Sequence, residues 1–381
     1  MKFKLPCEGV STPFYYYDME LLRSTLNEIK ECISGSDVHV HYAIKANGNP
    51  EILKVIADSG FGADCVSGGE IEAALAAGFS NDSIYYAGVG KTDREIIFGI
   101  ESGIGCFNVE SIEELKVISE LGERCGKKVP VALRVNPNID AHTHEYITTG
   151  LEENKFGIDM RCLDKAVDFA TASDWIDLIG LHFHIGSQIT ITEPFALLCE
   201  RINALTEYYR KRGVEFPVIN VGGGLGIDYD NPDENPVPDF RNYFNTLISG
   251  IHLTPGQQIH CELGRAVVAQ CGSLITQVLY VKEGIGRKFL IVDAGMNDLM
   301  RPALYGAHHK IETVNAEADA CEEVYDVVGP VCESSDVFGK GEKLPAVRRG
   351  DLIALRSAGA YGESMASTYN MRKLPGSLFI G

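Results

Sequence analysis

The stretch VHVHYAIKANGNPEILKVIADS, residues 38–59, contains the pattern that decides the fold. Its first part, Val38–Lys45, is rich in β-branched and aromatic residues and predicts a buried strand. Its second part, Pro50–Ser59, has helical periodicity and begins with proline, which is favoured in the first turn of a helix. A buried strand followed by such a helix is the repeating unit of a parallel α/β fold.

The same alternation continues as far as Glu262. Further strands are predicted at Phe61–Cys65, Ser83–Ala87, Ile104–Val109, Val129–Val135, Ile176–His184, Phe216–Val221 and Gln258–Glu262. Helices are predicted between them at Glu70–Ala77, Thr92–Ile100, Ser111–Leu121, Thr192–Arg212 and Phe240–Ile251. Eight strands with intervening helices favour a closed (β/α)8 TIM-like barrel, and an open doubly wound sheet is the alternative that the pattern allows.

From about Cys271 the pattern changes to strands separated by Gly and Pro turns, which predicts a mostly β second domain. The strand signals are Ser273–Val281, Lys288–Val292, Tyr325–Val331 and Leu352–Arg356. The N-terminal stretch Met1–Glu20, with its aromatic run Phe14–Tyr17, fits either domain.

The composition excludes several classes of function. The 381 residues include 34 Lys and Arg and 53 Asp and Glu, for a formal net charge of −19. This excess disfavours binding to nucleic acid or to an anionic membrane surface. No apolar run approaches the ~20 residues that cross a bilayer, and MKFKLPCEGV lacks the apolar core of a signal peptide. The 11 cysteines form no CxxC pair and no zinc-ligand spacing, so we expect free thiols, a cytoplasmic location and no metal site.

In such a barrel the active site lies at the carboxyl ends of the strands. The predicted strands end at or near Lys45, Asp64, Asn108, Asn136, His184, the glycine loop Gly222–Gly226, and the run from Glu262 through Gly264 to Arg265. Each signal has an ordinary structural explanation when it is taken alone, such as a solvent-facing lysine, a core histidine, a tight turn or a salt bridge.

Together these residues predict a pyridoxal phosphate site. Lys45 offers an amine for covalent attachment, and His184 offers a flat ring for stacking. Glu262 offers the carboxylate that a protonated ring nitrogen needs. The glycine loop, with Ser187 and Arg265, offers donors to a phosphate.

The chain resembles the diaminopimelate decarboxylases, which belong to the alanine-racemase-like, fold-type III class of pyridoxal phosphate enzymes. The matching stretches are HYAIKAN, GADCVSGGEIEAAL, ITTGLEENKFGI, HFHIGSQI, VGGGLGIDY, ELGRAVVAQCG, DAGMNDLMRPALYGAHH, GPVCESSDVF and GDLIALRSAGAYGESMASTYN. They cover almost the whole chain in the family's order. The resemblance implies a cofactor-binding barrel over residues 25–270. It also implies a β domain formed by residues 1–24 and 271–381, which serves dimerisation and substrate contacts.

The resemblance also implies roles for individual residues. Lys45 would be the attachment point of the cofactor, with Asp64 near it, His184 on the ring and Glu262 at the ring nitrogen. The residues implied at the phosphate are Ser187, Gly223, Gly224, Gly264 and Arg265. Tyr361 would lie against cofactor and substrate. On the substrate side, Arg265, Arg301 and Tyr305 would hold a distal carboxylate. Cys332, as proton donor, and Glu333 would reach into the partner's site in a homodimer with shared active sites.

The implied reaction is decarboxylation of meso-2,6-diaminopimelate to L-lysine and CO2, the last step of lysine biosynthesis. A distal carboxylate calls for arginine, which suits this substrate. The alternatives are a decarboxylase of carboxynorspermidine, ornithine, arginine or carrier-bound glutamate, a racemase, and a non-enzymatic pyridoxal-binding protein. The composition of Thr143–Phe156 suits a loop, which we expect to act as a lid.

Overall fold

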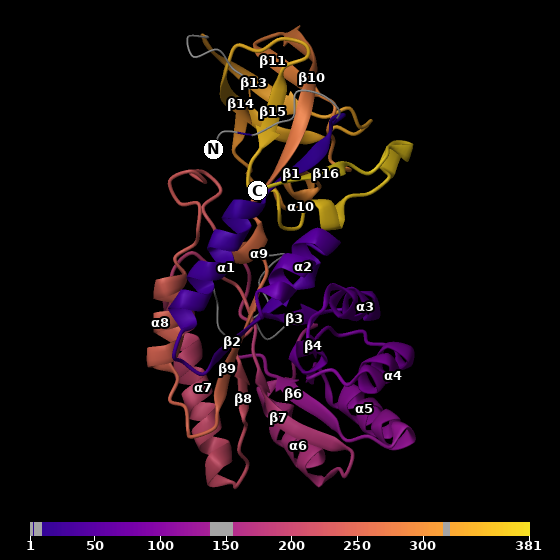
Figure 1. Ribbon diagram of the computed structural model, residues 1–381, viewed down its shortest axis with the longest axis vertical. Coiled ribbons are helices and arrows are strands. Elements are labelled where there is room, and N and C mark those ends of the chain that lie inside the picture. Colours follow the sequence, from indigo (N-terminus) through magenta and orange to yellow (C-terminus); the bar gives the residue numbers. More distant parts are fainter. Residues whose placement is uncertain (1–2, 4–9, 138–154, 315–320) are drawn as a thin grey trace. The chain divides into compact units, whose positions relative to one another are not determined.

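The computed structural model describes residues 3, 10–137, 155–314 and 321–381 (Figure 1). The chain forms two compact units, one of Leu26–Gly226 with Asp239–Gly264, and one of Met1–Thr25, Ile227–Pro238 and Arg265–Gly381. The second unit thus includes residues 227–238 and 265–270, which the sequence prediction assigned to the barrel. The expected lid, Thr143–Phe156, lies outside the described residues except for its last two.

The first unit is a closed barrel of eight parallel strands that follow one another in chain order. Its strands are β2 (Val38–Ala43), β3 (Gly62–Cys65), β4 (Ile84–Tyr86), β5 (Cys106–Val109), β6 (Val129–Arg134), β7 (Ile176–His182), β8 (Val218–Asn220) and β9 (Gln258–Leu263). Strand β2 pairs with both β3 and β9, so the first and last strands close the ring. The predicted barrel is confirmed, and the open-sheet alternative is wrong.

Helices lie around the outside of this barrel (Figure 1). They are α2 (Pro50–Asp58), α3 (Gly68–Ala77), α4 (Asp93–Ser102), α5 (Ile112–Cys125), α6 (Met160–Ala172), α7 (Glu193–Lys211) and α8 (Phe240–Gly250). Helix α6 is absent from the sequence prediction. Helix α1 (Met19–Ile33) precedes the first barrel strand, and the unit boundary falls within it.

Helix caps explain why several of these helices begin and end where the sequence predicted. Helix α4 starts with a capping box, in which the Thr92 side chain accepts from Glu95 N and the Glu95 carboxylate accepts from Thr92 N. Ser111 caps α5 in a similar way, accepting from Glu114 N. Helix α3 ends at Gly78, whose left-handed φ of 93° suits glycine.

Side chains inside the barrel form layers, because every second residue of a strand points inward. One layer is an apolar cluster of Tyr85, Cys106, Ala132 and Val218. Two residues further along β5, β6 and β8, toward the carboxyl ends, the side chains become polar: Asn108, Arg134 and Asn220. The strand register therefore predetermines where polar groups gather.

Two buried histidines meet where the barrel closes. His41 on β2 and His260 on β9 are joined by a hydrogen bond of 2.8 Å between His41 Nε2 and His260 Nδ1. His41 Nδ1 lies 3.0 Å from the carbonyl oxygen of Ser83. Since that oxygen only accepts, His41 carries its proton on Nδ1, and His260 is the donor to His41 Nε2.

The second unit contains one mixed sheet. Its strands are β1 (Phe14–Asp18), β10 (Gly272–Gly284), β11 (Arg287–Val292), β12 (Ile311–Thr313), β13 (Glu322–Val328), β14 (Val337–Pro345), β15 (Leu352–Leu355) and β16 (Gly376–Ile380). Strand β1 pairs antiparallel with β10 and parallel with β16, so the N-terminal aromatic run belongs to this sheet. The four predicted strands correspond to β10, β11, β13 and β15, while β12, β14 and β16 were not predicted.

Short helical elements complete this unit. They are α9 (Arg265–Val268), α10 (Arg301–Tyr305) and the 3-10 turns Glu363–Met365 and Tyr369–Met371. In the described part of the chain, no helix has the length and apolar character that a membrane span requires.

Candidate active site

Lys45 lies just beyond β2, at the carboxyl end of the barrel. The strand ends at Ala43, so Lys45 sits in a single 3-10 turn (Ile44–Ala46) rather than at the strand end that the sequence predicted. Its Nζ donates to Asp64 Oδ2 over 3.3 Å, and its side chain is 41% exposed, whereas the Asp64 side chain is fully buried. The amine is thus held by Asp64 and remains accessible to a reactant.

Asp64, on β3, is a buried acid whose ionisation is balanced by its neighbours. Burial raises the pKa of Asp64 to about 7; the charge of Glu262 adds to this effect, and Lys45 opposes it. Its Oδ1 has no hydrogen-bond partner among the described residues. A buried acceptor without a hydrogen bond destabilises the fold unless a ligand or water donates to it. This indicates a polar binding site around Lys45.

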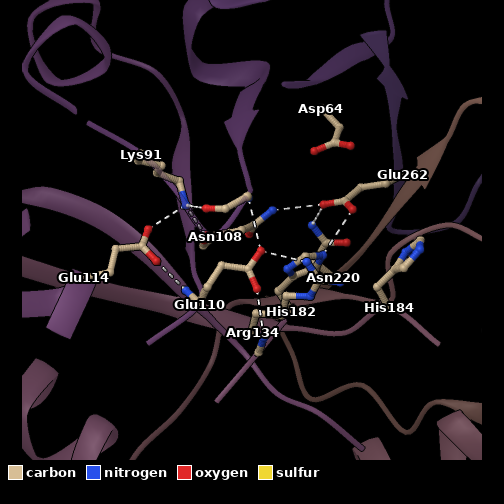
Figure 2. Close-up of polar contacts among 12 residues, drawn as sticks. Asp64, Lys91, Asn108, Glu110, Glu114, Arg134, His182, His184, Asn220 and Glu262 are labelled. Atoms are coloured by element: carbon tan, nitrogen blue, oxygen red, sulfur yellow. Dashed lines mark hydrogen bonds and ion pairs between the residues drawn. The ribbon is translucent and has the colours of Figure 1, made fainter. Parts of the chain in front are cut away.

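Glu262, on β9, is the buried carboxylate at the centre of the barrel. Figure 2 shows three donors that converge on it from three other strands. Oε1 accepts from Asn108 Nδ2 at 3.0 Å and from Asn220 Nδ2 at 2.8 Å, and Oε2 accepts from His182 Nε2 at 3.1 Å. Burial opposes ionisation, but His182 and Lys45 outweigh it and hold the pKa of Glu262 well below its usual range.

His184 follows β7 by two residues and presents a neutral ring. The Gly223 amide donates to His184 Nδ1 over 3.3 Å, so the ring proton lies on Nε2. Burial, together with the charges of Arg134 and Lys45, lowers the pKa of His184 well below its ordinary value. A neutral imidazole is a flat surface that suits stacking against an aromatic ring.

The loop Gly222–Gly226 passes between two other segments at distances that exclude side chains. A Cβ at Gly222, whose φ is +71°, would lie 2.1 Å from the Phe183 carbonyl oxygen. One at Gly223 would lie 2.1 Å from the carbonyl oxygen of Glu262. The loop also exchanges backbone hydrogen bonds with Ile189, which places it next to the turn that carries Ser187. The glycines therefore allow the backbone of the loop to lie close to Glu262 and to the turn that carries Ser187.

A second buried polar network, also drawn in Figure 2, braces the neighbouring loops of the barrel. Lys91 Nζ donates to Glu114 Oε1 at 2.6 Å and to the Asn108 carbonyl oxygen at 2.8 Å. Arg134 Nη1 donates to Glu110 Oε1 at 2.7 Å. These ion pairs are almost fully buried, so they orient the ends of β4 to β6 rigidly.

In the second unit, two buried arginines share a set of tyrosines. Arg265 Nη1 donates to the Tyr229 hydroxyl at 2.6 Å, and its guanidinium lies 5.0 Å from the Tyr361 ring. The Arg301 guanidinium lies 5.6 Å from the Tyr229 ring, 5.9 Å from the Tyr305 ring and 5.8 Å from the Tyr361 ring. The structure thus brings together four predicted site residues of this unit.

Arg301 is a buried cation that the described residues do not neutralise. Burial lowers its pKa and Arg265 adds to this, while Tyr229, Tyr361 and Tyr305 oppose it, so the largest influences on this guanidinium include no carboxylate. Arg301 Nε donates to His309 Nε2 over 3.3 Å, which leaves the terminal nitrogens of the fork for other partners. Buried charges are normally paired, so this guanidinium is prepared for an anionic group.

Tyr361 and the segment after it adopt uncommon backbone conformations. The φ angles of Tyr361, Asn370 and Met371 are 55°, 54° and 58°, all in the left-handed region. Such conformations cost on the order of 1–3 kcal/mol for residues other than glycine and cluster at functional sites. The strain at Tyr361 is consistent with a side chain that must face the arginines.

Cys332 and Glu333 form a separate group of contacts in the same unit. Both residues are exposed. Cys332 N donates to Asn370 Oδ1 at 3.0 Å, and the Tyr369 hydroxyl donates to the Glu333 carboxylate. The turn that carries Asn370 therefore fixes the Cys332 loop, with both functional groups facing solvent in the single chain.

Sequence reasoning named Asn108 as a strand end without giving it a role, and it missed three residues of the site: His182, Asn220 and Tyr229. Asn220 is the last residue of its strand and directly precedes the glycine loop, so the strand-end rule that identified Glu262 also applies to it. Tyr229 lies inside the matched stretch VGGGLGIDY. His182 is the last residue of β7, two residues before His184, inside the stretch that the sequence predicted as one strand.

The barrel residues fit pyridoxal phosphate on chemical grounds. They supply an accessible amine, a neutral flat ring, an ionised buried carboxylate and a close-packed glycine loop, which match the cofactor's aldehyde, ring faces, ring nitrogen and phosphate. The unpartnered Oδ1 of Asp64 beside the amine shows that the pocket is built for a polar occupant.

Comparison with known proteins agrees with this fit. The family described as pyridoxal-dependent decarboxylase, pyridoxal binding domain, matches residues 19–269. A diaminopimelate decarboxylase of Bacteroides thetaiotaomicron is 58% identical over 367 residues, covering 96% of this chain and 95% of that protein. The chain belongs to the diaminopimelate decarboxylase family. It is therefore a pyridoxal-phosphate-dependent carboxy-lyase.

Solved structures of this family share the whole fold. The crystal structure of diaminopimelate decarboxylase from Helicobacter pylori complexed with L-lysine is 41% identical, with a TM-score of 0.91, and covers 97% of this chain and 92% of that chain. The diaminopimelate decarboxylase of M. jannaschii in co-complex with L-lysine is 36% identical, also with a TM-score of 0.91, covering 97% and 87%.

The close packing of the glycine loop yields a first prediction. Gly223→Ala places a Cβ against the Glu262 carbonyl oxygen, so we expect a loss of about 1–3 kcal/mol in the free energy of unfolding, measured by urea denaturation. Gly90→Ala is the matched control, because its Cβ meets nothing within 4 Å; its effect should stay within about 0.5 kcal/mol. Equal stability of the two variants would contradict the packing argument.

Proposed function

We propose that this protein decarboxylates meso-2,6-diaminopimelate to L-lysine and CO2, the last step of lysine biosynthesis. The observation that carries the proposal is the buried, un-neutralised guanidinium of Arg301 beside Arg265, which suits a substrate with a second carboxylate. The names of the relatives support it further. Ornithine and arginine carry no distal carboxylate and give these arginines no counter-charge.

In this proposal the barrel residues bind and orient the cofactor. When bound, pyridoxal phosphate supplies an electron sink for the bond that breaks. Lys45 Nζ would hold the cofactor covalently through its aldehyde, and Asp64 would orient Lys45. Glu262 would stay ionised to accept a hydrogen bond from the ring nitrogen, and the neutral ring of His184 would contact the cofactor ring. Ser187, Gly223, Gly224, Gly264 and Arg265 would hold the phosphate.

Substrate recognition is assigned to the arginine and tyrosine cluster of the second unit. Arg301 and Arg265 bind the distal carboxylate, with Tyr305 alongside. Tyr361 lies against cofactor and substrate, and its position is supported by its distance of 5.0 Å from the Arg265 guanidinium. A planar fork recognises a carboxylate by two parallel hydrogen bonds, so arginine serves better than lysine at this site.

The proposal includes a homodimer with shared active sites. Cys332 Sγ would protonate Cα after CO2 leaves, and Glu333 would bind the distal ammonium, both acting in the partner's site. Support comes from the exposure of both residues and from the exposed side chains Met371 and Leu374, which follow Asn370, the residue that accepts a hydrogen bond from Cys332 N. Exposed apolar side chains next to functional groups suit a surface that a partner covers.

We also propose a cytoplasmic location. The ten described cysteines are free thiols, several of them buried in the barrel. Free thiols persist in a reducing compartment.

The central assignment can be tested with purified protein and meso-diaminopimelate. Wild-type enzyme should release CO2 and form L-lysine in equal amounts, whereas Lys45→Ala should lose activity together with the visible absorbance of lysine-bound cofactor. Lys54→Ala is the control, since Lys54 lies exposed on α2, where it pairs with Asp58 one turn along the helix. Retention of the visible band in Lys45→Ala would refute the role of Lys45, and release of CO2 from ornithine instead would refute the substrate.

The role of Arg301 predicts a loss of substrate affinity. Arg301→Ala should reduce kcat/KM for meso-diaminopimelate by about 10- to 100-fold, because a charge-assisted hydrogen-bond pair is lost. Most of the change should be a higher KM, since the distal carboxylate is bound and is not altered by the reaction. Arg301→Lys should fall between wild type and Arg301→Ala, because it keeps the charge and loses the fork. An unchanged KM for meso-diaminopimelate in Arg301→Ala would exclude this role.

Shared active sites predict complementation between two inactive variants. Lys45→Ala and Cys332→Ala should each have low kcat as pure homodimers. When the two are unfolded together and refolded, mixed dimers contain one intact site each, so about a quarter of the wild-type activity should return. Mixtures of separately folded proteins serve as the control. No recovery, in a sample whose mixed dimers are demonstrated by differential tags, would mean that each site is built from one chain.

A further inference from the structure

One buried amide in the barrel bonds to two different parts of the candidate cofactor site. Asn220, the last residue of β8, has a fully buried side chain. Its Nδ2 donates to Glu262 Oε1 at 2.8 Å, and its Oδ1 accepts from the Gly222 amide at 2.9 Å. Both ends of the amide are thus used, one on the ring acid and the other on the glycine loop.

The orientation of this amide is fixed by its partners. The Glu262 carboxylate only accepts, so it must face the NH2 group of Asn220, and the Gly222 N–H only donates, so it must face the oxygen. Backbone bonds reinforce the arrangement: Glu262 N donates to the Gly222 carbonyl oxygen at 2.8 Å, and Val221 N donates to the His260 carbonyl oxygen at 2.8 Å. A rotation of the amide would break both side-chain bonds at once.

Asn108 provides a natural comparison within the same barrel. Its Nδ2 donates to the same Glu262 Oε1, at 3.0 Å. Its Oδ1, however, lies 3.9 Å from Cys106 Sγ, a weak donor, and not on the glycine loop. Asn108 therefore supports the ring acid alone, whereas Asn220 supports the ring acid and the loop.

We propose that Asn220 is a positioning residue that couples the two ends of the cofactor site, fixing the ring acid Glu262 and the phosphate-binding loop at Gly222 relative to each other. This inference rests on the proposed pyridoxal phosphate site. When the cofactor ring binds at Glu262, the glycine loop is already in position for the phosphate, so the two groups are recognised together. Loss of the coupling should weaken recognition of the phosphate even though Asn220 does not touch it.

Substitutions at the two asparagines separate the two bonds. Asn220→Ala removes both of its bonds. Asn220→Asp keeps an oxygen that accepts from Gly222 N, but it loses the donor to Glu262 and adds a like charge. Asn108→Ala removes only a donor to Glu262. Asn220→Asp also preserves the volume of the side chain, so it guards against a result caused by poor folding of Asn220→Ala.

The first measurement compares binding of pyridoxal phosphate and of pyridoxal, which lacks the phosphate, to cofactor-free protein by equilibrium dialysis. The ratio of the two dissociation constants reports the phosphate contribution. We expect this ratio to fall about tenfold in Asn220→Ala and in Asn220→Asp, the equivalent of one hydrogen bond, because both variants break the link between Glu262 and the glycine loop. The ratio should stay at the wild-type value in Asn108→Ala, which should weaken binding of both ligands by a similar factor.

The second measurement needs no cofactor. Hydrogen exchange of the peptide that contains Gly222 should be faster in Asn220→Ala than in wild type, and unchanged in Asn108→Ala. An unchanged ligand ratio in Asn220→Ala, with unchanged exchange, would overturn the coupling while leaving the cofactor assignment intact. Wild-type protein that binds neither pyridoxal phosphate nor pyridoxal would overturn the proposed cofactor site and the coupling with it.

Discussion

A carboxylate kept ionised in the interior of a barrel is the constraint around which this structure is arranged. Removing Glu262 from water is unfavourable unless hydrogen bonds replace the lost solvation. Three strands each supply one donor, from Asn108, His182 and Asn220. The polar layer of the barrel, the order of its strands and the approach of the glycine loop all follow from meeting that requirement at one point.

The protein is acidic overall, and yet its proposed site binds anions. The formal net charge is −19, yet the groups proposed to meet a phosphate and two carboxylates are cations, Lys45, Arg265 and Arg301. Arg265 and Arg301 are buried among tyrosines, whose faces and hydroxyls stabilise positive charge without cancelling it. The acidic excess lies elsewhere on the chain, so overall charge is a poor guide to local potential.

The sequence was sufficient to predict the eight barrel strands and the functional residues near their carboxyl ends, but not the contacts across the barrel. Strand-end reasoning found Lys45, His184 and Glu262 because a local pattern marks each strand. The pairing of Asn220 with Glu262 depends on strand register, which no local pattern encodes. Tyr229 was missed for a similar reason, since its partners Arg265 and Arg301 are distant in sequence. In strand β14, two glycines and three charged residues interrupt the apolar ones, so it lacks the continuous apolar signal that revealed its neighbours.

The histidine pair that joins β2 to β9 gives the barrel an acid-sensitive closure. Burial lowers the pKa of His41 from its ordinary 6.5 to about 4, so the folded protein favours the neutral ring. The stabilising contribution is complete above pH 6.5 and declines as the pH falls toward 4, because the unfolded chain takes up the proton first. A proton on His41 Nε2 would also remove the acceptor for His260. Mild acid therefore weakens this enzyme where the first and last strands of its barrel meet, on the two strands that position Lys45 and Glu262.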